Sequence, residues 1–156
     1  MADGTMTANG LEYGDLLSVV DRARQALRCD EAGLIHVRGT WAMPAAHTSE
    51  VAGALDRAQC DVGEGPSLDA IRQLQAMSVA DVSDLTWWPV FRRTALDGGV
   101  KSCLAVPLTV GSDVVGALGF YSRRANALAG CEELALHIAD RAGSTMTGEP
   151  PPSRRD

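Results

Sequence analysis

Two neighbouring apolar segments in the C-terminal half of the chain constrain the fold most strongly. Residues 101–110 and 113–122 each follow strand-like alternation, and no side chain from Cys103 to Val110 or from Val114 to Tyr121 is charged. The three residues "GSD" that separate the segments are typical of a hairpin turn. The pattern therefore predicts an antiparallel pair of strands that is covered on both faces.

A sheet that is buried on both sides needs helices on both sides, and the rest of the chain can supply them. The apolar spacing and the cap residues predict helices over 11–28, 50–58, 66–74, 84–99 and 128–146. Further strands are expected at 32–37, 41–47 and 76–82. Adjacent strands joined by short turns indicate an antiparallel sheet in an α+β arrangement.

The length of 156 residues fits one domain, which we expect to span 11–146. Residues 1–10 are small and polar and residues 147–156 are rich in proline and charge, so both ends are expected to be disordered. The net charge of −6 argues against a nucleic-acid or membrane surface. Four widely spaced cysteines, with no signal-like N-terminus, favour a reduced cytoplasmic protein.

The stretch "QCDVGEGPSLDA" at 59–70 raises the question of a phosphate-binding loop. It has no lysine and no G-K-[ST] sequence, and Glu64 would repel a phosphate. A structural corner accounts for the same residues: Gly63 and Gly65 permit positive φ, and Pro66 can begin a helix. We therefore interpret this stretch as a turn that leads into a helix.

Several stretches, taken in order, resemble a GAF domain. They are "AGLIHVRG" followed by "AAHTSEVA", "GEGPSLDA", "VADVSDLTWWPVF" and "GVKSCLAVPLTVGSDVVGALGFYSR", which together cover most of 30–125. The chain looks most like the GAF domains that precede ANTAR RNA-binding modules in actinobacterial regulators. Two departures matter: no ANTAR module follows, which implies a separate output protein, and Ser67 stands where relatives often carry cysteine.

The resemblance implies a PAS-like antiparallel sheet of five or six strands in the order 2-1-5-4-3. It places the terminal helices on one face, where 11–28 and 128–146 would form a homodimer. The other face, framed by 47–75 and 83–98, would hold a small-molecule pocket. Such domains usually act as sensors in signal transduction and transcription regulation rather than as enzymes.

Seven residues are candidates for contact with a ligand. Trp88 and Phe91 match a W-P-x-F run of the family, and the additional Trp87 is the better ligand-facing candidate, because pocket walls favour aromatic side chains. His47 should lie near the rim of the pocket at a strand end. The full set is His47, Cys60, Ser67, Trp87, Trp88, Phe91 and Tyr121.

No spacing of residues indicates a catalytic group or a metal site, and the sequence does not identify a cofactor or a ligand. Cys60, expected in a polar loop beside Asp61, and Cys103 leave open a thiol-dependent reductase of the free methionine sulfoxide type. A third hypothesis is a GAF scaffold whose pocket is filled by side chains and which binds only proteins. The leading hypothesis is a non-enzymatic sensor for a small cytosolic ligand or a protein partner.

Overall fold

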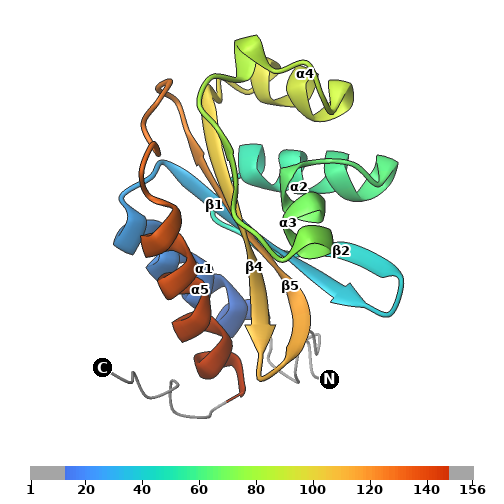
Figure 1. Ribbon diagram of the computed structural model, residues 1–156, viewed down its shortest axis with the longest axis vertical. Helices are drawn as coiled ribbons and strands as arrows, with labels where there is room; N and C mark the ends of the chain where they lie inside the picture. The colour runs from blue at the N-terminus through green and yellow to red at the C-terminus, as the bar shows by residue number, and fades with distance from the viewer. Residues whose placement is uncertain (1–12, 148–156) are drawn as a thin grey trace.

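The computed structural model describes residues 13–147 (Figure 1). Its helices are α1 (Tyr13–Leu27), α2 (Glu50–Val62), α3 (Pro66–Gln73), α4 (Pro89–Asp97) and α5 (Glu132–Thr147). Its strands are β1 (Glu31–Arg38), β2 (Trp41–His47), β3 (Met77–Val79), β4 (Ser102–Val110) and β5 (Asp113–Ser122). The expectations for 1–10 and for the tail after Thr147 lie outside the described residues.

The five strands form one antiparallel sheet in the order β2-β1-β5-β4-β3, which confirms the predicted topology. β5 lies at the centre and pairs with β1 on one side and with β4 on the other. The predicted hairpin of two apolar segments is therefore the middle of the sheet rather than an edge.

Helices cover both faces of the sheet, as the uncharged strands predicted. α1 and α5 lie against one face, and α2, α3 and α4 lie on the opposite side (Figure 1). Alternate residues of the central strands point to opposite faces and pack into two separate hydrophobic cores. Leu118 and Phe120 pack beneath α1 and α5, whereas Cys103 and Tyr121 pack beneath α2 and α4.

Two predicted helices begin later in the structure. The segment predicted as a helix over 84–99 begins only at Pro89, because proline lacks the N–H that a helix interior needs and so suits the first turn. The helix predicted over 128–146 begins at Glu132, because Gly130 takes a left-handed conformation.

The strand predicted over 76–82 is shorter in the structure. It spans only Met77–Val79, and a single 3₁₀ turn, Val82–Asp84, follows it.

Helix α2 is longer than the predicted 50–58 and continues to Val62. The side chain of Ser49 accepts a hydrogen bond from the N–H of Ala52 and caps the start. Gly63 ends the helix in a left-handed conformation, with its N–H bonded to the carbonyl of Gln59. The extra turn brings Gln59 and Cys60 into the helix.

Small residues line the middle of the sheet on the face that carries α2 and α3. Gly33 of β1 lies directly opposite Gly119 of β5, and Ala105 of β4 lies beside Gly119. A methyl group on Gly33 would collide with the carboxylate of Asp56, and one on Gly119 would lie 2.7 Å from the hydroxyl of Tyr121. The paired glycines, which we call the glycine floor, therefore make room for polar side chains above the sheet.

This close approach predicts that Gly33→Ala destabilises the protein. The added methyl group has no space, so we expect the free energy of unfolding to fall by about 1–3 kcal/mol in urea denaturation. Gly14→Ala is the control, because Gly14 lies in α1 with no atom within 4 Å of the added methyl group. Equal effects of the two substitutions would contradict the packing described here.

Candidate functional site

Four buried polar residues meet above the glycine floor. Asp56 and Gln59 come from α2, Ser67 from α3 and Tyr121 from β5, and none of the four is more than 1% exposed. The spacing of Asp56 and Gln59 places them on the same side of α2, together with the buried Leu55. The helix thus turns two polar side chains toward the sheet. We call these four residues the polar cluster.

A continuous set of hydrogen bonds connects three elements through the polar cluster. The hydroxyl of Tyr121 donates to Asp56 Oδ1 at 2.7 Å. Gln59 Nε2 donates to the Tyr121 oxygen and to the carbonyl of Leu55, both at 3.3 Å. The backbone N–H of Ser67 donates to Gln59 Oε1 at 2.8 Å. The central strand, α2 and the start of α3 are therefore held together by side chains.

Three buried side-chain atoms in this region have no hydrogen-bond partner among the described residues: Asp56 Oδ2, Ser67 Oγ and His47 Nδ1. Asp56 Oδ2 lies over Gly33, and Ser67 Oγ would lie 3.2 Å from a methyl group on Gly119. His47 is paired with Gly33 across β2 and β1, and its ring packs on Gly53 of α2. Buried polar atoms without partners are costly, and each one calls for an explanation.

The environment of Asp56 favours its neutral form. Burial raises the pKa of Asp56 to about 7, although the hydrogen bond from Tyr121 and the charge of Arg57 act in the opposite direction. Burial, with the neighbouring Asp56, also raises the pKa of Tyr121 well above its usual value. Burial and Arg57 lower the pKa of His47. The carboxyl of Asp56 therefore titrates close to neutral pH.

Aromatic rings form a wall beside the polar cluster. The ring of Phe91 lies 6.5 Å from that of Tyr121 and 6.3 Å from that of Trp88, measured between centroids. Trp88 is 9% exposed, but Trp87 is 63% exposed and meets only the edge of Trp88. The structure thus brings Trp88, Phe91, Tyr121 and Ser67 together and leaves Trp87, the preferred aromatic candidate, at the surface.

The placement of Cys60 corrects the sequence analysis. Cys60 lies in the last turn of α2 rather than in a polar loop, because the helix continues to Val62. Burial, Asp56 and Asp61 raise its pKa to about 12, and burial alone raises the pKa of Cys103 to about 12. Because the thiolate is the reactive form, both groups are poor nucleophiles near neutral pH.

The corner at 63–66 has the predicted geometry. Gly63 and Gly65 both have positive φ, and Pro66 begins α3. The N–H of Ser67, which a phosphate at this helix start would need, is already bonded to Gln59 Oε1. The corner therefore positions Ser67 over the glycine floor.

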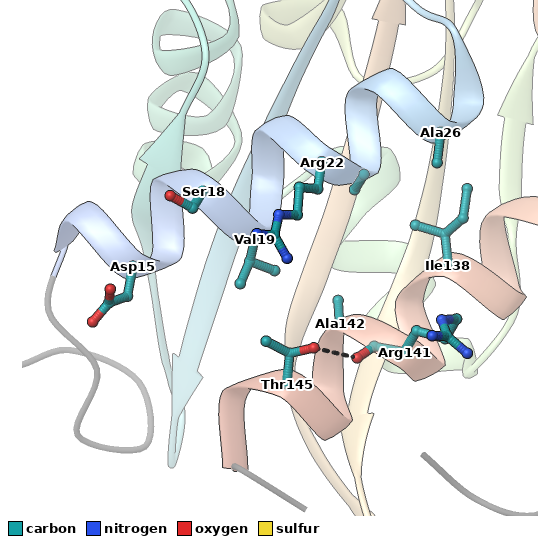
Figure 2. A pocket seen from close by; sticks show the side chains of 10 residues that line it. Asp15, Ser18, Val19, Arg22, Ala26, Ile138, Arg141, Ala142 and Thr145 are labelled. Atoms are coloured by element: carbon teal, nitrogen blue, oxygen red, sulfur yellow. Dashed lines mark hydrogen bonds between the residues drawn. The ribbon is translucent and has the colours of Figure 1, made fainter. Parts of the chain in front are cut away.

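A groove of about 650 Å³ lies on the opposite side of the molecule between α1 and α5 (Figure 2). Val19 and Ile138 are mostly buried there, with Asp15, Arg22 and Arg141 around them. This groove combines apolar and charged side chains of both signs.

Comparisons with known proteins agree with this architecture. Residues 16–144 match a family model described as GAF domain. The chain belongs to the GAF domain family. No curated protein sequence matches it.

Solved structures show the same GAF fold at low sequence identity. A domain of a proposed two-component sensor histidine kinase from Sinorhizobium meliloti has a TM-score of 0.66 at 20% identity, covering 83% of this chain and 86% of that one. The photoproduct state of GAF3 from Slr1393 of Synechocystis gives 0.66 at 19%, with coverages of 86% and 92%. The blue-light-absorbing PixJ GAF domain of Thermosynechococcus elongatus gives 0.60 at 16%, with coverages of 86% and 82%.

Two features are absent from the described residues. Within residues 13–147, no three His, Cys, Asp or Glu side chains come together in a way that could hold a metal ion. Among the helices of that part of the chain, none has the length and apolar character required to cross a membrane.

Sequence reasoning did not identify Asp56, Gln59 or the paired glycines. The available signal was the spacing of Ala52, Leu55, Asp56 and Gln59, which places two polar residues on the apolar side of α2. The predicted helix ended at 58, so Gln59 fell outside it. The pairing of Gly33 with Gly119 depends on strand register, which no local pattern reveals.

The raised pKa of Asp56 predicts a specific pH dependence of stability. The folded protein retains this proton between about pH 4 and pH 7, whereas the unfolded chain releases it near 3.8. The contribution of Asp56 to stability therefore falls as pH rises through that range. We expect urea denaturation to show the wild type losing stability relative to Asp56→Asn between pH 5 and pH 8.

The matched control is Asp113→Asn, which removes the same charge from the exposed hairpin turn. Its difference from the wild type should vary much less with pH. A constant difference between the wild type and Asp56→Asn would mean that Asp56 does not titrate as described.

Proposed function

We propose that this GAF domain is a non-enzymatic sensor that binds a small molecule between the sheet and helices α2, α3 and α4. The observation that carries the proposal is the convergence of unpartnered buried atoms, Asp56 Oδ2 and Ser67 Oγ, above the glycine floor. Aromatic rings beside a few polar groups are typical of small-molecule sites. A ligand that pairs with these atoms would offset the cost of burying them.

Binding would act through the position of α2 and α3. The two helices close over the polar cluster, so a ligand reaches it only when they move away from the sheet. Gln59 links both helices to Tyr121 of the central strand, so an arrangement selected by the ligand extends to β5. The opposite side of β5 packs beneath α1 and α5, which gives a route for a shift in population to reach the far face.

The signal would pass to a second copy of the chain through α1 and α5. Asp15, Val19, Arg22 and Ala26 follow one another at spacings of four, three and four residues along α1. Leu134, Ile138, Arg141 and Thr145 repeat the same spacing on α5. This is the spacing of helices that pack in bundles, and Asp15 can meet an arginine of a second copy.

The remaining parts of the proposal concern location and output. Four free cysteines fit a reducing cytosol, and a separate output protein in bacterial transcription regulation would receive the signal. The reductase alternative requires ionised thiols, which the raised pKa values of Cys60 and Cys103 oppose. Reduction of free methionine sulfoxide by the wild type but not by Cys60→Ser would restore that alternative.

Native mass spectrometry of the purified protein, followed by thermal shift against a metabolite panel, tests for a ligand. We expect a retained mass or a specific rise in melting temperature for the wild type. Trp88→Phe should weaken it because Trp88 forms part of the wall, whereas Trp87→Phe should not because Trp87 is exposed. A mass spectrum with no retained ligand, together with no thermal shift, would contradict the sensor hypothesis and favour the protein-binding scaffold.

The dimer has its own test. We expect light scattering at micromolar concentration to give twice the mass of the chain for the wild type. Ala26→Glu and Leu134→Glu should shift the protein toward monomer, because both side chains are exposed along the proposed seam. Ala129→Glu, at an exposed position outside the groove, is the control. A monomeric wild type would remove this part of the proposal.

A further inference from the structure

Two buried carboxylates lie on the same side of the sheet, and only one has a cationic partner. Glu31 is 5% exposed and forms an ion pair with Arg123 at 2.7 Å, and it also accepts a hydrogen bond from the hydroxyl of Ser49. Asp56 is fully buried, yet no ion pair within residues 13–147 includes it. Its second oxygen has no hydrogen-bond donor among the described residues.

We propose that the site takes a small nitrogen cation that carries N–H donors, an alkylammonium or alkylguanidinium group, with Asp56 as its counter-ion. This inference rests on the proposed function and names the class of ligand. The cation would form an ion pair with Asp56, as Arg123 does with Glu31. When Asp56 is ionised, a paired and hydrogen-bonded positive charge would compensate the cost of burying its carboxylate.

The arrangement of the other groups fits such a cation. Ser67 Oγ lies above Gly119, on the strand next to Gly33, over which Asp56 Oδ2 lies. Gly33 and Gly119 are direct partners across β1 and β5, so the two unpartnered oxygens lie above the same pair of residues. The ring of Tyr121 carries the hydroxyl that donates to Asp56 Oδ1, and the ring of Phe91 lies 6.5 Å from it, so aromatic side chains lie near this position.

The charges near the site separate this class from others. An anionic ligand would be repelled by ionised Asp56 and, at longer range, by the net charge of −6. A neutral donor would satisfy the free oxygen but would leave the negative charge without compensation. Small apolar residues and aromatic rings line the rest of this face, which suits a short alkyl chain behind the charged end.

The titratable groups around Asp56 define the pH range for the test. They are Arg57 and Cys60 on α2, His47 on β2, Tyr121 on β5 and Cys103 on β4. The pKa of His47 is lowered from 6.5, and the two thiols and Tyr121 titrate well above pH 8.5. Between pH 6.5 and 8.5, the charge of Asp56 is therefore the one that changes most in this group.

The experiment is a titration of the full chain, followed by NMR chemical shifts, with four probes of matched size. Butylammonium and butylguanidinium are the cations, 1-butanol is the neutral probe and butyrate is the anion. We expect the wild type to bind the two cations and to bind them about fourfold more tightly at pH 8.5 than at pH 6.5, as Asp56 ionises around pH 7. Butanol and butyrate should bind at least about tenfold more weakly.

Variants connect the binding to Asp56. Asp56→Asn should weaken cation binding about tenfold and remove its pH dependence, whereas Asp113→Asn should behave as the wild type. Tyr121→Phe keeps the ring and removes a hydrogen bond that favours the ionised carboxyl, so it should shift the pH midpoint of cation binding upward. This last variant keeps the test decisive if Asp56→Asn does not fold.

Each contrary result has a defined meaning. Equal binding of all four probes, or unchanged cation binding by Asp56→Asn, would overturn the inference. A retained neutral or anionic metabolite in native mass spectrometry, with no binding of the cations, would overturn the ligand class and leave the sensor in place. No binding by any probe or metabolite would overturn both proposals.

Discussion

A buried hydrogen bond from Tyr121 to Asp56 connects the sheet to the helices that cover one of its faces. It joins the central strand to α2, and through Gln59 the same group reaches the first turn of α3. The interaction is possible only because Gly33 and Gly119 leave space above the sheet. The position of the α2–α3 pair, and with it any site beneath, depends on this contact and on the two glycines.

The two faces of the sheet differ in what they bury. The face under α1 and α5 is a packed apolar core that includes Leu118 and Phe120. The opposite face includes Asp56, Gln59 and Ser67 among its buried residues. Since unpaired buried polar groups reduce stability, the second face carries a cost to folding that the apolar face does not.

Much of the fold could be predicted from local patterns, because burial imposes a period on each strand and helix. The hairpin at 101–122 and the helix at 11–28 repeat their apolar residues in that way, and the sheet order followed from the resemblance carried by motifs such as "GEGPSLDA". The candidate site was predicted only in part. Trp88, Phe91 and Tyr121 lie together, but the end of α2 was placed too early, so Gln59 was missed and Cys60 was assigned to a loop.

The sequence by itself determined the class of fold, the sheet with two covered faces and the turn at Gly63–Pro66, because these depend on side-chain period and on the backbone freedom of glycine and proline. Tertiary structure alone decided that Asp56 is buried with no ion-pair partner in residues 13–147, that Trp87 is exposed and that Gly33 faces Gly119. Those properties arise from contacts between residues far apart in the chain. The charge and pairing of a buried group depend on every element packed around it, which no local pattern records.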